Sequence, residues 1–168
     1  MMGYDLTGAF RMRVSPIAAS LALALALAGC QQPQQAAKAP AGPSPEALTK
    51  QIQATLPAPY NTADVAAGRQ DFQLCSACHT VIEGGANMTG PNLHGVFGRK
   101  AGTHPGYAYS GVVQAAGFVW DPAHLDQWLT APQTYLKGAK MSFPGLKDPK
   151  ARADVIAYLA VASSGGPQ

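Results

Sequence analysis

One run of five residues constrains this chain more than any other: residues 75–79 read Cys-Ser-Ala-Cys-His, the pattern C-x-x-C-H. This spacing is the attachment pattern of a c-type haem. Two thiols add across the two vinyl groups of one porphyrin, so they must lie about one helical turn apart, and the next imidazole then reaches the iron. The motif therefore predicts one covalent haem c, with its iron, attached at Cys75 and Cys78 and ligated by His79.

Three other roles for a C-x-x-C pair fit this sequence less well. A dithiol redox pair usually follows a strand and lacks the trailing histidine. A zinc site needs a second pair of thiols, whereas the only other cysteine is Cys30. A structural disulfide across so short a loop is strained and constrains little of the unfolded chain. The haem therefore remains the best interpretation of the motif.

The charge pattern excludes nucleic acid as an expected partner. The formal net charge is +3, charged residues make up 12% of the chain, and Lys and Arg are scattered. Binding to nucleic acid requires a basic patch. The abundance of Ala, Gly and Pro is instead typical of a small, loop-rich domain whose core is completed by an apolar prosthetic group.

The first 29 residues have the layout of an export signal. Arg11 and Arg13 supply the positive charge, and an apolar stretch from Ile17 to Ala28 follows, too short for the roughly 20 residues that span a bilayer. The stretch ends in Leu-Ala-Gly-Cys, which resembles a bacterial lipobox, so Cys30 is expected to be the lipid-modified first residue of the mature protein. The alternative is an ordinary cleaved signal peptide followed by an unrelated cysteine.

Residues 30–59 are expected to be a disordered linker, because they are rich in Gln, Pro and Ala and poor in large apolar side chains. Within them, only Glu46 to Leu56 has the pattern of a transient helix. A flexible linker of this length spans on the order of 30 Å. A globular domain is expected over residues 60–163, and residues 164–168 are expected to be a flexible tail.

Helices are predicted at both ends of the domain and in its middle. The first covers Ala63 to Leu74, with Thr62 as its N-cap. Asp121-Pro122 and Asp148-Pro149 each have the N-cap-then-proline pattern of a helix start. Residues 84–111 are rich in Gly and Pro and predict loop, and no strand pair is expected, so the fold class is all-α. The apolar stripe of the last helix is expected at Ala151, Val155, Ile156 and Leu159.

A six-coordinate haem iron needs a second axial ligand, and two methionines, Met88 and Met141, lie beyond the motif. Met141 lies in a turn-rich segment between two helices, which can bring its thioether to the iron face opposite His79. An isolated Met is more often core filler than ligand, but an iron that lacks a sixth ligand reverses this preference. The other histidines, expected to be solvated, are His94, His104 and His124.

The segments around these residues resemble class I cytochromes c of the mitochondrial and α-proteobacterial type, from Asp64 to Ala162. The resemblance implies the cytochrome c fold, in which a few helices and long loops wrap around one covalent haem. With the lipobox and the linker, the chain resembles a membrane-tethered member of that family. The supporting segments are Gly90 to Lys100, Pro105 to Ser110, Tyr135 to Phe143 and Arg152 to Leu159.

The resemblance also implies a role for each matching residue. His79 and Met141 are implied as axial ligands, and the Pro91 carbonyl as acceptor of a hydrogen bond from the other nitrogen of His79. Phe143 is implied to cover the haem edge. Contacts to the inner haem propionate, otherwise a costly buried charge, are implied for Arg99, Tyr109 and Trp120. A close crossing of the first and last helices is implied at Gly68, Phe72 and Tyr158.

Four residues depart from the pattern of that family. Trp128 stands where a Tyr usually contacts the Met sulfur, Ala139 where a Thr hydroxyl binds a propionate, and Val113 where an Asn joins buried water. Each lost hydrogen bond is worth about 0.5–1.5 kcal/mol, so a shifted potential or a looser Met141 loop is expected, with the ligands retained. Leu74 stands where a Lys is typical, so electrostatic steering of partners is expected to be weak.

The sequence thus predicts a single-haem electron-transfer protein of a respiratory or photosynthetic chain, and not an enzyme. The expected donor is a quinol–cytochrome c oxidoreductase or a periplasmic dehydrogenase, and the expected acceptor is a terminal oxidase, a peroxidase or a photosynthetic centre. We expect a monomer on the periplasmic side of the bacterial inner membrane, anchored by the lipid at Cys30, with the outer membrane as the alternative. The alternative function is a haem peroxidase or a gas-sensing haem domain with a labile Met ligand.

Overall fold

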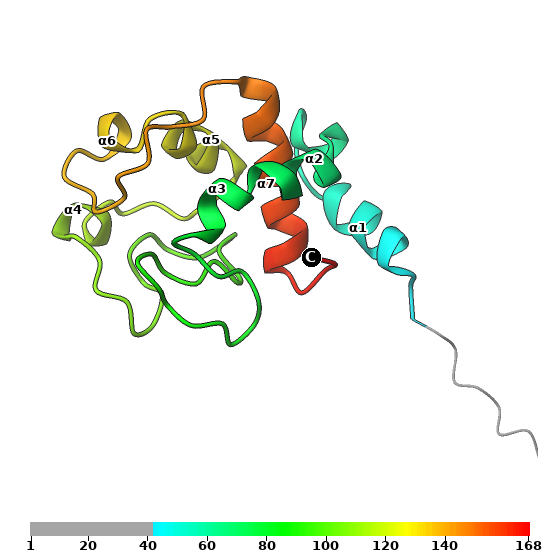
Figure 1. Cartoon of the computed structure of the whole chain (residues 1–168), viewed down its shortest axis with the longest axis horizontal. Coiled ribbons are helices and arrows are strands. Elements are labelled where there is room, and N and C mark those ends of the chain that lie inside the picture. The colour runs from blue at the N-terminus through cyan, green and yellow to red at the C-terminus, as the bar shows by residue number, and fades with distance from the viewer. Residues whose placement is uncertain (1–41) are drawn as a thin grey trace, which may run out of the picture. The chain divides into compact units, whose positions relative to one another are not determined.

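The computed structural model describes residues 42–168, so the predicted signal peptide and the lipid site at Cys30 lie outside the described residues. The described part contains no strand, only an isolated antiparallel bridge between Lys100 and Val119, which confirms the all-α fold class. None of its helices is long and apolar enough to cross a membrane. In chain order they are α1 (Pro45–Gln53), the 3₁₀ turn η1 (Tyr60–Thr62), α2 (Val65–Asp71), α3 (Gln73–Ser76), α4 (Gly111–Gln114), α5 (Pro122–Thr130), α6 (Pro132–Tyr135) and α7 (Pro149–Ser163) (Figure 1).

Both helices predicted to begin with an Asp-Pro pair are present. The Asp121 carboxylate accepts a hydrogen bond from the His124 N–H at 2.7 Å and caps α5. The Asp148 carboxylate accepts from the Lys150 N–H at 3.0 Å and caps α7. In each helix the proline occupies the first helical position, where its missing N–H costs nothing.

The start of the first predicted helix is different from the prediction. Thr62 is not its N-cap, because the Thr62 hydroxyl donates to the Pro59 carbonyl at 3.2 Å. Asp64 caps α2 instead, and its carboxylate accepts from the N–H groups of Ala66 and Ala67 at 2.9 and 3.0 Å. A carboxylate offers the acceptor that a threonine offers and adds a negative charge at the positive helix end, so the later cap is the stronger one.

The crossing of α2 and α7 fixes the framework of the domain. A Cβ atom on Gly68 would lie 1.9 Å from the Asp154 carbonyl oxygen, so only glycine allows the two backbones to come this close. The rings of Phe72 and Tyr158 pack beside the crossing, with centroids 5.2 Å apart. The Asp64 N–H donates to the buried Asp154 carboxylate at 2.8 Å and ties the start of α2 to α7.

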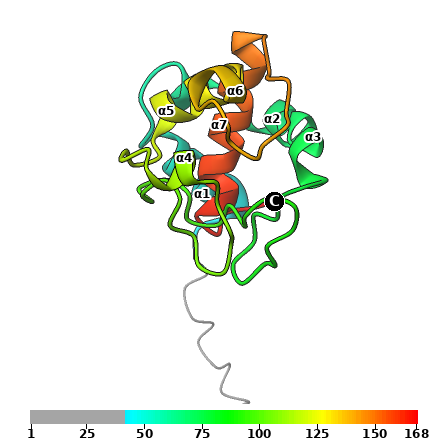
Figure 2. The same ribbon diagram turned by 90° about the vertical axis from the view of Figure 1, so that its left-hand side faces the viewer.

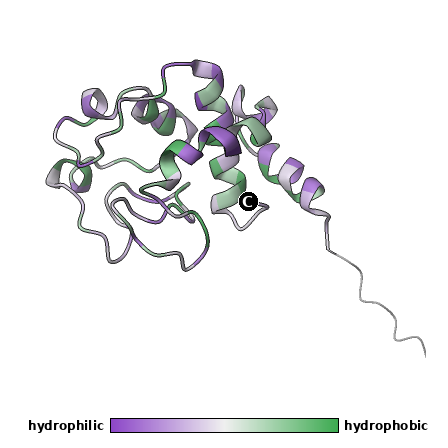
Figure 3. Cartoon of the chain, in the orientation of Figure 1, coloured by the Kyte–Doolittle hydropathy of each residue, from purple (hydrophilic) through white to green (hydrophobic). Residues whose placement is uncertain are grey.

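Part of the segment expected to be disordered linker is a helix that packs on the domain. The helix is α1, capped by Ser44, and it packs against α7 and η1. The Gln53 side-chain amide donates to the carbonyls of Tyr60 at 3.2 Å and Ala63 at 2.6 Å. Figure 3 shows both hydrophilic and hydrophobic residues on α1, as expected of a helix with one packed face. Ordered structure therefore begins well before the predicted boundary at residue 60.

Helix α7 lies between two sets of elements. Figure 1 shows α1 on one side of α7 and α4, α5 and α6 on the other, and Figure 2, turned by 90°, agrees. Residues 152–163 are all buried, so the buried surface of α7 is wider than the predicted stripe. The stripe prediction assumed one solvated face, whereas α1, α2, α5 and η1 all pack against α7.

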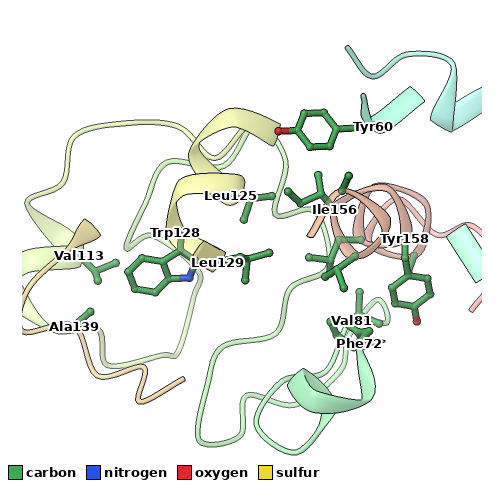
Figure 4. Close-up of a cluster of buried hydrophobic side chains, with 14 residues drawn as sticks. Tyr60, Phe72, Val81, Val113, Leu125, Trp128, Leu129, Ala139, Ile156 and Tyr158 are labelled. Atoms are coloured by element: carbon green, nitrogen blue, oxygen red, sulfur yellow. The ribbon is translucent and has the colours of Figure 1, made fainter. Parts of the chain in front are cut away.

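The hydrophobic core surrounds a cavity. In Figure 4, Val113, Trp128 and Leu129 lie on one side, and Phe72 and Val81 lie on the other. Both sets belong to one hydrophobic core, and an apolar group in the cavity would contact the two sides of it. The core residues that also line the cavity are Phe72, Val113, Leu125, Trp128, Leu129, Ala139, Val155 and Leu159.

Candidate functional site

The cavity has a volume of about 400 Å³, within the range of ligand-binding pockets. Its walls come from α3, α5, α7 and the loops that precede α4 and α7. The structure brings together every site residue predicted within the described part of the chain. These lining residues are Cys75, Cys78, His79, Pro91, Arg99, Tyr109, Trp120, Met141 and Phe143.

The C-x-x-C-H motif forms a tight turn at the end of α3. The N–H groups of Cys78 and His79 both donate to the Cys75 carbonyl at 3.0 Å, which brings both thiols and the imidazole to the same cavity. Burial, followed by the charges of Cys78 and Asp71, raises the pKa of the Cys75 thiol to about 11. A dithiol redox pair depends on a lowered thiol pKa, so this site does not suit that chemistry. Residues 42–168 also contain no cluster of three or more His, Cys, Asp or Glu side chains suited to a metal ion.

The imidazole of His79 is held in a single tautomer. Its Nδ1 lies 2.7 Å from the Pro91 carbonyl oxygen, and because a carbonyl only accepts, Nδ1 carries the proton and Nε2 keeps its lone pair. Burial lowers the pKa of His79, although the bond to Pro91 partly opposes this, so the ring is neutral near pH 7. A Cβ on Gly90 would lie 2.3 Å from His79 Cε1, so glycine is required beside the ring. The neutral, oriented ring is the form that binds a metal.

Met141 is the methionine that the fold brings to the cavity. It is half-buried in the loop between α6 and α7 and lines the cavity. Gly138 turns this loop with a φ of 91°, a backbone angle that favours glycine. Met88, the other candidate, is 47% exposed and is not among the lining residues. The geometry therefore favours Met141 as the partner of His79.

One wall of the cavity is positioned by backbone pairing. The Trp120 N–H donates to the Arg99 carbonyl at 2.9 Å, and the Gly98 N–H donates to the Trp120 carbonyl at 2.9 Å. The Arg99 guanidinium donates to the carbonyls of Asn92, at 3.3 Å, and His94. Burial lowers the pKa of Arg99, and Tyr109 partly opposes this. The result is a half-buried cation on an otherwise apolar wall, which suits an anionic group.

Beside this wall lies a hydroxyl group that the sequence analysis did not single out. The Oγ atom of Ser110 is buried, lines the cavity and has no hydrogen-bond partner in the described part of the chain. The neighbouring Tyr109 lines the same region, and burial raises the pKa of its phenol. Ser110 lay in a segment that carried the family resemblance, which was the available signal. A buried donor without a partner indicates that the cavity accommodates a polar acceptor here.

The expectation that the three remaining histidines are solvated is wrong. His94, His104 and His124 are all half-buried, and the Nδ1 atoms of His94 and His104 are buried without a partner in the described part of the chain. The His124 ring stacks on Phe118 with centroids 4.4 Å apart, and its Nδ1 lies 2.8 Å from the Asp121 carboxylate. None of the three lines the cavity, so they stay outside the candidate site.

These features fit a haem. The apolar walls match the porphyrin faces, and His79 and Met141 offer a nitrogen and a sulfur ligand from the same cavity. Arg99 and the unpartnered Ser110 hydroxyl offer donors to a propionate carboxylate. The two thiols of the C-x-x-C-H turn lie at the edge of the same space.

Comparison with known proteins identifies the family. Residues 65–163 match the family model for cytochrome c. The chain is 45% identical to cytochrome c of Sesamum indicum over 102 residues, 60% of this chain and 92% of the relative. It is 42% identical to cytochrome c2 of Agrobacterium tumefaciens over 107 residues, 62% and 96% of the two chains. The solved structure of cytochrome cH from Methylobacterium extorquens is similar at a TM-score of 0.55 and 47% identity, covering 58% of this chain and 97% of that one. The chain therefore belongs to the cytochrome c family, and it is a single-haem electron carrier that holds haem c, with its iron, covalently.

Proposed function

We propose that Cys75 and Cys78 form the thioether bonds to the haem, and that His79 Nε2 and the Met141 sulfur are the axial ligands of its iron. The observation that carries this assignment is that all four side chains line one mostly apolar cavity, with the His79 ring oriented by its hydrogen bond to the Pro91 carbonyl. When bound, the haem supplies a one-electron ferrous–ferric couple.

The side chains around the cavity tune this couple. Apolar walls disfavour net charge, and a neutral imidazole with a thioether favours the ferrous state, so the midpoint potential is positive. The Arg99, Tyr109 and Ser110 side chains stabilise a propionate in its ionised form. Phe143, half-buried beside Met141, covers the haem edge and keeps water from the thioether side.

We propose that the protein is not an enzyme, because an iron with both axial positions occupied has no site for a substrate. A peroxidase or a gas-sensing domain would need Met141 to leave. Carbon monoxide separates these functions, because it binds a ferrous haem only at an open position. The carrier assignment requires that the resting ferrous protein does not bind carbon monoxide.

The residues at the mouth of the cavity indicate how a redox partner docks. The fully exposed lining residues are Leu74, Thr89, Lys140 and Ser142, and only Lys140 is charged. Its ammonium donates to the Ala108 carbonyl at 2.5 Å and is thus held against the domain. Leu74 exposes 62% of its surface. A mouth with so little free charge supports docking through short-range contacts, with little electrostatic steering.

We propose a quinol–cytochrome c oxidoreductase or a periplasmic dehydrogenase as the donor, and a terminal oxidase, a peroxidase or a photosynthetic centre as the acceptor. The protein acts as a monomer on the periplasmic side of the inner membrane, held by a lipid at Cys30. The lipobox-like residues before Cys30 support the anchor. A tether raises the local concentration of the carrier near membrane partners, which compensates for weak steering. Cys30→Ser is expected to release the protein from membranes, as fractionation would show; retention on the membrane would refute the anchor.

An optical redox titration of the purified full chain tests the site assignment. We expect a low-spin spectrum, a clearly positive midpoint potential and no carbon monoxide binding. A high-spin ferric spectrum or a negative midpoint potential would show that Met141 is not the ligand. Binding of carbon monoxide to the resting protein would favour the peroxidase or sensor function.

A further inference from the structure

We propose that Gln133 is a positioning residue that clamps the Met141 loop, residues 136–142, and thereby sets how readily Met141 leaves the iron. The proposal rests on the proposed role of Met141 as an axial ligand. Gln133 lies in α6, is exposed and does not line the cavity. The sequence analysis did not identify it as a functional residue.

A single side chain makes three hydrogen bonds to this loop. Gln133 Nε2 donates to the Ala139 carbonyl at 2.7 Å and to the Met141 carbonyl at 2.8 Å. Gln133 Oε1 accepts a longer hydrogen bond from the Gly138 N–H at 3.4 Å. The chemistry matches at every contact, because an amide nitrogen carries two donors and its oxygen accepts. The clamp therefore acts on the backbone of Met141 itself and on two residues before it.

The residues of α6 on either side of Gln133 are held by packing. The neighbouring Pro132 is fully buried. The ring of Tyr135, at the end of α6, packs beside Phe118 and Trp128 with centroids 5.8 and 6.4 Å away. Packing of the residues on either side thus fixes the backbone of Gln133, so its side chain can transmit that rigidity to the loop.

Few other hydrogen bonds hold the loop. The Ala139 N–H donates to the Leu136 carbonyl at 3.0 Å, which closes a local turn at Gly138. The other long-range hydrogen bond runs from the exposed Lys140 ammonium to the Ala108 carbonyl. Ala139 has no hydroxyl that could bind a propionate. The Leu136 N–H donates to the Pro132 carbonyl at 2.9 Å, which ties the start of the loop to α6. Gln133 is therefore the side chain that joins residues 138–141 to that packed helix.

The test uses the full-length haem-loaded protein and three variants. Gln133→Leu removes all three hydrogen bonds at similar size. Gln133→Glu keeps the acceptor for Gly138 but removes both donors and sets a carboxylate against two carbonyls. Gln127→Leu is the matched control, since Gln127 is also an exposed glutamine, on α5 and outside the cavity lining.

The first readout is the rate at which imidazole displaces Met141 from the ferric protein, followed through loss of the sulfur–iron absorption band. Loss of two short hydrogen bonds predicts an increase on the order of 10-fold in Gln133→Leu, and at least as much in Gln133→Glu. We expect Gln127→Leu to match the wild type. Wild-type rates in both Gln133 variants, or an equal increase in the control, would overturn the clamp.

The second readout separates the clamp from the ligand assignment. Amide hydrogen exchange across residues 136–142 reports opening of the loop whether or not Met141 binds iron. Faster exchange in Gln133→Leu, with the control unchanged, supports the clamp even if the wild type lacks the sulfur–iron band. Absence of that band in the wild type would instead refute Met141 as the ligand. Unchanged exchange in both Gln133 variants would refute the clamp.

Discussion

The two sides of α7 close the domain in different ways. Val155 and Leu159 line the cavity, so this side of the helix packs against the haem site. Val161 follows Leu159 by two residues, about 200° further around the helix, and approaches Gly166 together with Ile52 of α1. One side is therefore completed by a prosthetic group, and the other by a segment of the chain that precedes the domain. The comparison shows that a small domain can supplement its core from two sources, only one of which is redox-active.

The largest effect on stability is expected from loss of the haem on the cavity side of α7. Cys75→Ala with Cys78→Ala prevents covalent attachment, so the core side chains that surround the cavity lose their common contact. Since small domains have only about 5–15 kcal/mol of stability, we expect loss of most of it and of cooperative thermal unfolding, followed by far-UV circular dichroism. A sharp unfolding transition close to that of the haem protein would show that the cavity side does not depend on the haem.

The next effect is expected at the framework that both sides share. Gly68→Ala puts a Cβ 1.9 Å from the Asp154 carbonyl and must separate α2 from α7. We expect a loss of about 3 kcal/mol or more, measured by denaturant unfolding of the haem protein. Gly111→Ala is the control, because a Cβ at Gly111 meets nothing within 4 Å. Equal stability of the two variants would mean that the crossing relaxes without cost.

A smaller effect is expected on the α1 side. Ile52→Asp places a charge where α1 meets the end of α7, and loss of this half-buried contact should cost about 1–2 kcal/mol. The midpoint potential should stay unchanged, because α1 does not contribute to the cavity wall. Gln51→Asp, on the exposed face of the same helix, is the matched control. A shifted potential in Ile52→Asp would show that the two sides of α7 are coupled.

The same contrast explains what the sequence could and could not predict. The haem attachment site was predictable because haem chemistry imposes a fixed spacing on residues 75–79, and the starts of α5 and α7 because the Asp-Pro pairs mark them locally. Apart from Met141, the other cavity residues were expected only from the family resemblance. The packing of α1 was not predictable, since its apolar residues, among them Leu48 and Ile52, are too few to indicate burial until α7 supplies the partner surface.

Two polar residues also have roles that the sequence could not predict. Ser110 stands at the N-cap position of α4 without capping an N–H, so its buried hydroxyl lines the cavity and lacks a partner in the described part of the chain. Gln133 reaches Met141 only because the chain folds back over α6, and an exposed glutamine carries no local sign of that. The prediction for the half-buried histidines was wrong for a related reason, since tertiary packing of long loops determines their exposure and local composition does not.

The smallest effect on stability is expected at acid pH. It differs between the cavity side of α7 and the α1 side. Burial raises the pKa of Asp121, but hydrogen bonds from the His124 N–H and imidazole outweigh it and leave the pKa below its usual value. The pKa of Asp64 is lowered by the Ala67 N–H, with burial partly opposing. A carboxyl whose pKa is depressed by folding stabilises the protein above its unfolded pKa of about 4, and this contribution is lost as the pH falls through the folded value.

Asp121→Asn and Asp64→Asn should therefore each flatten the decrease in thermal midpoint below about pH 4, while an asparagine cap keeps stability near pH 7 within about 1 kcal/mol. Asp121 caps α5, which forms a cavity wall. The pH-dependent contribution of Asp121 to stability should therefore vanish in the Cys75→Ala, Cys78→Ala protein. Asp64 caps α2, and its N–H donates to Asp154 of α7. The pH-dependent contribution of Asp64 to stability should therefore remain as long as α1, α2 and α7 stay folded together. The far-UV circular dichroism signal, titrated from pH 3 to 7 in the haem-free background, decides this without requiring a cooperative thermal transition, since loss of both contributions together would mean that the haem supports both sides of α7.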